Sequence, residues 1–297
     1  MLSESGLKRR ALLIQAIRRF FIDRDYIELD TPVRLPVLIP EACNLPVESA
    51  ECYLQTSPEI CMKRVLAATG CPKIFQICPC FRHKERSDRH LPEFTMLEWY
   101  RSQCDYHSLM DECEELVRYL VQSDSLVYNG KVIDLTKPWM RLSVEEAFRR
   151  YAPVTLTAAL ADNSFDEMLC KNIEPELGLE SPVFLHDYPA SLGALARKKK
   201  SDPSVAERFE LYIGSMELAN GFSELTDQVE QRQRFEQELQ SIKKESRSST
   251  GIPEKFLACL PQMEEAAGIA LGVDRLAMVL WNKSTIDEVV PFVPEDL

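Results

Sequence analysis

The segment from Gly268 to Leu276 reads Gly-Ile-Ala-Leu-Gly-Val-Asp-Arg-Leu. Its pattern predicts a short apolar strand, a glycine turn and a helix that runs to Trp281. Arg275 falls in the first turn of that helix, where free backbone N–H groups and the helix dipole already favour an anion. The segment therefore predicts a binding site for a polyphosphate, although a single match of this kind does not identify an enzyme.

A second segment, residues 93–100, reads Glu-Phe-Thr-Met-Leu-Glu-Trp-Tyr and predicts a strand. Because side chains alternate between the two faces of a strand, one face carries Phe94, Met96, Glu98 and Tyr100. An aromatic ring, a carboxylate and a phenol on one face are suited to the floor of a ligand site. The pattern alone favours the alternative, an ordinary half-buried strand with Glu98 towards solvent.

A hairpin with a charged tip is predicted around this strand, with residues 74–82 as the partner strand. The connecting loop and its edges carry a dense polar cluster, Arg82, Lys84, Glu85, Arg86, Arg89 and His90. So many cations can bind phosphate groups. Taken alone, the loop is better explained as a solvated surface turn.

Carboxylates also gather further along the chain, at Glu210, Glu217 and Glu224, with Asn220 among them. The last three of these four positions fit one face of a helix, while the apolar neighbours and Gly221 fit two strands with a bulge. Clustered carboxylates suit Mg²⁺ or a cationic substrate. Surface acidity in an acidic protein is the alternative.

The composition excludes several classes of protein. The 297 residues include only 10 glycines and contain neither G-x-G-x-x-G nor G-x-x-x-x-G-K-[ST], so the common glycine-rich loops for nucleotide phosphates are missing. A formal net charge of −12 argues against a general nucleic-acid binder. The sequence shows no signal peptide, no apolar run long enough to span a membrane and no C-x-x-C pair among its 10 cysteines. We therefore expect a cytoplasmic protein with reduced thiols.

The order of predicted elements shows no regular βα alternation. This favours an α+β fold, an antiparallel sheet flanked by helices, over a doubly wound one. Residues 8–22 are predicted to form an amphipathic helix. Residues 33–56 are expected to be irregular and residues 141–200 mostly helical. We expect a single domain over residues 1–297.

Five segments together resemble the catalytic domain of class II aminoacyl-tRNA synthetases of the lysyl type, over nearly the whole chain. They are residues 81–85 (F-R-x-x-E), 89–100 (R-H-x-P-E-F-T-M-L-E-W-Y), 207–210 (E-R-F-E), 217–227 (E-L-A-N-G-F-S-E-L-T-D) and 268–276 (G-I-A-L-G-V-D-R-L). The chain looks most like the free-standing paralogues that attach lysine or β-lysine to elongation factor P. Two features favour the paralogues: there is no room for an anticodon-binding domain, and Ala270 stands where lysyl-tRNA synthetases usually have glycine.

The resemblance implies that ATP and Mg²⁺ activate lysine or (R)-β-lysine, which then passes to elongation factor P rather than to tRNA. It implies a homodimer joined through the motif Leu29-Asp-Thr-Pro32. The implied ATP-binding residues are Arg82, Glu85, His90, Phe94 and Arg275, of which Arg82 and Arg275 are catalytic. The implied amino-acid-binding residues are Ser57, Glu59, Glu98, Tyr100, Asn220, Glu224 and Ala270. Glu210 and Glu217 are the implied Mg²⁺ ligands.

One position departs from the family pattern. The synthetases carry F-R-x-E, whereas this chain has Lys84 at the glutamate position and Glu85 one residue later. Three alternatives are a truncated lysyl-tRNA synthetase, a catalytically inactive regulatory paralogue and an asparagine synthetase on the same fold, which the lysyl-type Glu98-Trp-Tyr100 disfavours. The sequence does not distinguish lysine from (R)-β-lysine, and it indicates no base for the acceptor amine.

Overall fold

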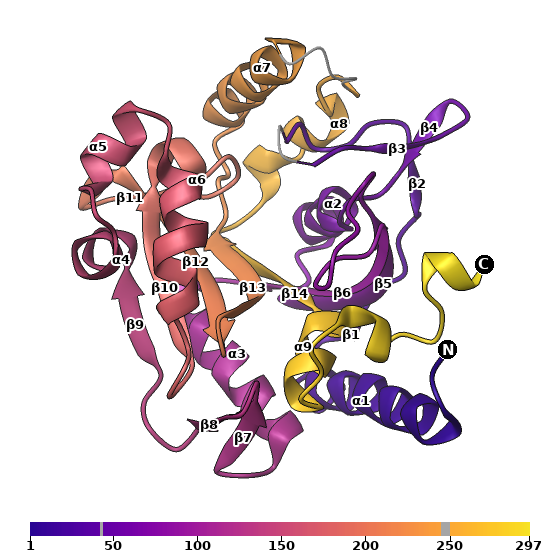
Figure 1. Cartoon of the computed structure of the whole chain (residues 1–297). Coiled ribbons are helices and arrows are strands. Elements are labelled where there is room, and N and C mark those ends of the chain that lie inside the picture. Colours follow the sequence, from indigo (N-terminus) through magenta and orange to yellow (C-terminus); the bar gives the residue numbers. More distant parts are fainter. Residues whose placement is uncertain (42–43, 245–249) are drawn as a thin grey trace.

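A sheet of nine strands, mostly antiparallel, runs through the centre of the described chain (Figure 1). The computed structural model describes residues 1–41, 44–244 and 250–297. The strands lie in the order β1 (Ile27–Glu28), β5 (Lys73–Phe81), β6 (Glu93–Ser102), β14 (Ala266–Gly272), β13 (Met216–Ser223), β12 (Asp202–Ile213), β10 (Val183–Pro189) and β9 (Met140–Ser143), with β11 (Lys198–Lys199) beside β12. Within the described residues, β1 pairs with β5 and β9 with β10 in parallel, and the other neighbours are antiparallel. The expected α+β fold is therefore confirmed.

One face of the sheet packs against α1 (Glu4–Ile22), α3 (Tyr106–Val121) and α9 (Val273–Leu280). The helix expected over residues 8–22 begins earlier, because the Ser3 side chain accepts the N–H of Gly6 and caps it. From β6, Leu97 and Trp99 are fully buried in this core. Since residues alternate along β6, the intervening side chains lie on the opposite face, where the candidate site is found.

The opposite face carries a second core around Met62, Phe235 and Phe256. It is built with α2 (Glu59–Thr69), α7 (Gln228–Lys244) and α8 (Glu254–Leu257). A third core covers the far end of the sheet and includes α4 (Val144–Tyr151), α5 (Leu156–Ala161) and α6 (Phe165–Met168), followed by a π-helical turn at Leu169–Ile173. No helix in the described part of the chain is long and apolar enough to cross a membrane.

Two regions differ from the sequence-based expectation. Residues 33–56 contain a small sheet in place of irregular chain, formed by β2 (Arg34–Leu35), β3 (Val47–Ser49) and β4 (Cys52–Leu54). Residues 141–200 are not mostly helical, because β9 and β10 lie there and complete the central sheet. The short apolar run of β10 has no periodicity that separates a buried strand from a buried helix. A further two-stranded sheet joins β7 (Ser125–Tyr128) and β8 (Lys131–Asp134).

Candidate active site

A cavity of about 630 Å³ lies on the face of the sheet opposite to α1, α3 and α9, and β6, β10, β12, β13 and β14 contribute to its lining. The predicted site residues that line it are Ser57, Glu59, Arg82, Glu85, His90, Phe94, Glu98, Tyr100, Glu210, Glu217, Asn220, Ala270 and Arg275. Glu224 is the exception, because it is buried behind the cavity wall. The tertiary structure thus brings segments that are far apart in the sequence to one place.

The floor of the cavity is β6, as its alternation predicts. Phe94, Met96, Glu98 and Tyr100 all line the cavity, and Glu98 is only 2% exposed. The alternative in which Glu98 faces solvent is therefore wrong. The Tyr100 hydroxyl donates a hydrogen bond to Glu98 at 2.5 Å. Burial, with the nearby Glu59 carboxylate, raises the pKa of Glu98 well above its usual range.

A buried lysine that sequence reasoning missed lies beside this floor. The ammonium of Lys63, on α2, forms ion pairs with Glu59 and with Glu224, and the Lys63 residue is only 1% exposed. Burial alone would lower the pKa of Lys63, but the two carboxylates hold it above its ordinary value. Burial raises the pKa of Glu224 to about 8, against the lowering effect of Lys63. The one available signal was the i, i+4 spacing of Glu59 and Lys63, which brings them together on a helix.

Gly268 and Ala270 on β14 shape the wall of this acidic region. A Cβ at Gly268 would lie 2.2 Å from Cε1 of Tyr100 and 2.7 Å from Oε1 of Glu224, so only glycine permits this close packing. Ala270 pairs with Asn220 on one side and with Glu98 on the other. Ala270 therefore lines the cavity wall between an amide residue and a carboxylate residue.

The other end of the cavity presents cations. On α9, Arg275 donates to Glu217 Oε2 at 3.1 Å and contacts the ring of His90. Burial, together with the arginines around it, lowers the pKa of His90 to about 4. His90 is therefore neutral near pH 7, and Arg275 supplies the charge at this end. Gly272 caps α9 without a side-chain hydrogen bond, so no side chain competes for the first N–H groups.

The structure also resolves which residue of the hairpin loop faces the cavity. Lys84 has a positive φ of 63° and is exposed, whereas Glu85 lines the cavity, with its carboxylate 3.9 Å from the Arg82 guanidinium. The Arg82 guanidinium lies 5.2 Å from the centroid of the Phe94 ring. Glu85, not Lys84, is therefore placed to contact a ligand held over Phe94.

The two predicted Mg²⁺ ligands lie on neighbouring antiparallel strands, Glu210 on β12 and Glu217 on β13, and this strand pair contains a bulge. The alternative in which Glu217 and Asn220 lie on one face of a helix is therefore wrong. Glu210 accepts hydrogen bonds from Arg208 at 2.6 Å, from Tyr188 at 2.5 Å and from Tyr212 at 2.7 Å. The described residues contain no group of three or more metal-binding side chains. Two carboxylates nevertheless fit Mg²⁺ at a nucleotide, because this ion takes its remaining ligands from phosphates and water. Arg208, which also donates a hydrogen bond to Asn220 at 3.2 Å, lines the cavity and was not predicted from the sequence.

Comparison with known proteins assigns the class. The family model for class II tRNA synthetases (D, K and N) matches residues 3–296, and the chain belongs to this family. It is similar to the elongation factor P–(R)-β-lysine ligase of Pectobacterium carotovorum, with 38% identity over 99% of this chain and 96% of the relative. Ligases of the same name from Edwardsiella ictaluri and Hamiltonella defensa are each 37% identical, over 97% and 98% of this chain and 94% and 95% of the relatives. The predicted family and the prediction of an ATP-dependent ligase are confirmed.

Proposed function

We propose that this protein uses ATP to activate lysine or (R)-β-lysine as an aminoacyl adenylate, with release of pyrophosphate, and transfers the aminoacyl group to a lysine side chain of elongation factor P. The observation that carries the proposal is one cavity with an acidic end, around Glu59 and Glu98, and a cationic end at Arg275. A dicationic amino acid that leaves bulk water for a cavity needs carboxylates to balance its charge, and a polyphosphate needs cations. The names of the similar ligases support the same acceptor.

In the first step, the substrate carboxylate attacks the α-phosphorus of ATP and pyrophosphate leaves. That carboxylate is ionised near neutral pH, so no protein base is required. Arg82 holds the α-phosphate and the substrate carboxylate, Arg275 and His90 hold the outer phosphates, and Phe94 stacks on adenine. Glu210 and Glu217 hold Mg²⁺, which neutralises phosphate charge when bound. Positioning and charge neutralisation are the usual sources of rate in such transfers.

In the second step, the acceptor amine attacks the mixed anhydride and AMP leaves. The amine must first lose a proton, since its free pKa is about 10.4. Ser57 and Glu59 contact the α- or β-amino group of the bound amino acid, and Asn220 contacts its carboxylate. Glu98 and Tyr100 face the ε-ammonium, with Ala270 shaping the wall beside them. Glu224 acts from behind the wall, through its contact with Lys63.

A test of the function is ATP–pyrophosphate exchange with lysine, (R)-β-lysine and ornithine, followed by mass spectrometry of elongation factor P and of lysine tRNA. We expect exchange with a lysine isomer and a mass gain on elongation factor P alone. Charging of tRNA would identify a lysyl-tRNA synthetase, and no exchange with any substrate would identify an inactive paralogue.

We also propose a homodimer that forms around Pro32, which is exposed and follows α1 and β1. The support for it is the resemblance of residues 29–32 to the family's dimer motif. Light scattering after gel filtration should give twice the mass of 34.0 kDa. A monomer at micromolar concentration would contradict the proposal. Since the reaction uses ATP and a translation factor, we propose the cytoplasm as its compartment.

Replacing Glu224 with glutamine should weaken the amino acid far more than ATP. The Glu224→Gln variant keeps the shape but removes one of the charges that balance two substrate ammonium groups and Lys63. We expect the KM for the amino acid to rise about tenfold or more, the scale of one lost charged contact, and that for ATP to stay within about twofold. Steady-state exchange kinetics measure both, with the exposed Glu51→Gln as control. An unchanged KM for the amino acid would show that Glu224 does not contribute to amino-acid binding.

Amino-acid binding should strengthen as the pH rises towards 8. Burial raises the pKa of Glu224 to about 8 and that of Glu98 well above its usual range, so both carboxyls hold protons at lower pH. A dicationic substrate favours their ionised forms, and its binding therefore releases protons. Below about pH 8, each pH unit gained strengthens binding by up to about tenfold for one released proton. Calorimetry in two buffers of different ionisation enthalpy measures the release; proton uptake would contradict this account.

A further inference from the structure

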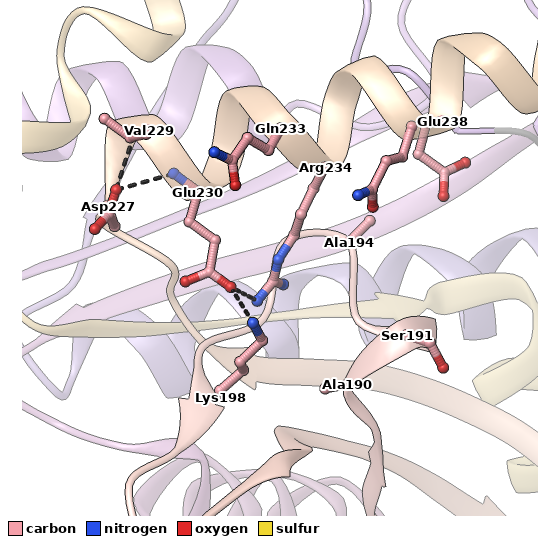
Figure 2. Close-up of a pocket in the computed structure, with 11 residues that line it drawn as sticks. Ala190, Ser191, Ala194, Lys198, Asp227, Val229, Glu230, Gln233, Arg234 and Glu238 are labelled. Atoms are coloured by element: carbon pink, nitrogen blue, oxygen red, sulfur yellow. Dashed lines mark hydrogen bonds and ion pairs between the residues drawn. The ribbon is translucent and has the colours of Figure 1, made fainter.

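A second cavity, of about 520 Å³, lies between α7 and residues 190–198 (Figure 2). It shares the wall residues Ser191, Ala194 and Glu238 with the active-site cavity. We call it the α7 groove. The two cavities thus adjoin, and the groove reaches the active site from outside.

The groove adjoins the part of the active site that ATP leaves accessible. In the proposed function, the nucleotide occupies the end marked by Phe94 and Arg275, and neither residue lines the groove. An acceptor amine must reach the adenylate carbonyl while the nucleotide is still in place. The groove provides an approach that does not cross the nucleotide.

The charges of the groove suit a cationic side chain. Glu230 forms ion pairs at 2.7 Å with both Lys198 and Arg234, so the two cations of the lining are already paired (Figure 2). Asp227 and Glu238 also line the groove, and the Asp227 carboxylate accepts hydrogen bonds from the backbone N–H groups of Val229 and Glu230. The lining therefore contains three acidic and two basic residues. A lysine ammonium is attracted to such a lining, whereas the phosphates of a nucleic acid are repelled.

Carboxylates continue from the groove into the active site. Glu238 lies on the shared wall, and its charge and that of Glu59 help to raise the pKa of Glu41, after the larger effect of burial. Glu41 lines the active-site cavity and accepts a hydrogen bond from Asn44 at 2.7 Å. A cation that enters the groove therefore meets acidic groups along its path to the amino-acid pocket.

The outer rim of the groove offers uncharged, exposed side chains to a protein partner. Val229, Gln233 and Gln237 lie four residues apart, on one side of α7, and all three line the groove. Val229 is 68% exposed, although α7 is otherwise highly charged. A polypeptide can pack against these uncharged side chains without burying a charged group.

We propose that the α7 groove docks the lysine-bearing segment of the acceptor protein and guides its lysine past Glu238 to the adenylate. The inference rests on the proposed function, and it adds the entry path of the acceptor. In the transfer, the lysine ammonium loses one proton, and its nitrogen forms a bond to the carbonyl carbon. The bond from that carbon to the AMP oxygen breaks, AMP leaves with the electron pair, and the nitrogen loses a second proton.

The test compares Gln233→Arg, in the groove, with Gln240→Arg, which is also exposed on α7 but lines neither cavity. The two variants change the net charge equally. We expect Gln233→Arg to raise the KM for elongation factor P about tenfold, because the new cation repels the incoming lysine. Lysine-dependent ATP–pyrophosphate exchange should stay at the wild-type rate in both variants, and Gln240→Arg should transfer normally. Val229→Arg provides a second groove variant with the same expectation.

Wild-type transfer by Gln233→Arg and Val229→Arg would overturn the groove assignment and leave the proposed function intact. An equal loss of transfer in Gln233→Arg and Gln240→Arg would also overturn it, since net charge would then explain the effect. If the wild-type protein modifies tRNA and not elongation factor P, the proposed function itself fails and the groove proposal fails with it.

Discussion

Arg275→Ala should abolish amino-acid-dependent ATP–pyrophosphate exchange. Arg275 stands in the first turn of α9, lines the cavity and supplies the positive charge there, because His90 beside it is neutral near pH 7. Loss of one positioned charge contact in a transition state costs about 3 kcal/mol or more, roughly a hundredfold or more in rate. Arg82→Ala should have an effect of the same size, since Arg82 lines the cavity and holds the α-phosphate in the proposed reaction.

A neighbouring arginine gives the matched control. Arg86 belongs to the same hairpin loop, but it pairs with Asp287 and Glu295 on the surface and does not line the cavity. Arg86→Ala should retain exchange close to the wild-type rate. Radioactive pyrophosphate exchange at saturating lysine and ATP measures all three variants. Exchange near the wild-type rate in Arg275→Ala would show that the phosphates are held elsewhere.

Lys63→Met should strongly destabilise the protein and impair amino-acid binding. The substitution leaves Glu59 and Glu224 without the ammonium that lies between them in the protein interior. Removal of one partner of a buried ion pair costs about 3–5 kcal/mol, because the remaining charge stays unpaired. Urea denaturation at pH 9, above the pKa of about 8 of Glu224, followed by tryptophan fluorescence, measures the free energy of unfolding.

Two further variants separate the charge effect from simple loss of packing. Lys63→Met combined with Glu224→Gln should recover part of the lost stability, because fewer uncompensated charges then remain. Lys8→Met, which removes an exposed i, i+4 partner of Glu4, should change stability little. A Lys63→Met variant as stable as the wild type would exclude the structural role of the ion pair.

Local patterns predicted the strand face and the helix start that contribute residues to the cavity. The period of two along β6 places Phe94, Glu98 and Tyr100 on one face, and the structure confirms that this face lines the cavity. The glycine turn before Arg275 predicts a helix N-terminus, and α9 begins there. These features depend on neighbours within one strand or one helical turn, so the sequence contains what is needed to infer them.

Other contacts could not be read from neighbouring residues. Lys63 forms an ion pair with Glu224, and more than half of the chain separates the two residues in the sequence. Glu238 lines the active-site cavity because α7 packs beside it. A charged residue on a predicted helix is usually solvated, and nothing local shows that Lys63 is buried. The β-strands within residues 141–200 were missed for a related reason. A short strand that is buried on both faces shows no alternation of apolar and polar residues along the sequence.

Amino-acid order alone establishes the family, the antiparallel α+β fold and thirteen of the residues that line the cavity. These conclusions come from short segments whose spacing is specific and whose periodicity is local. Long-range packing determines the charge inside the pocket, the replacement of Lys84 by Glu85 at the cavity and the groove beside α7. The reason is that burial, ion pairing and the meeting of two cavities are properties of segments far apart in the chain, and they arise only when the sheet and its helices pack together.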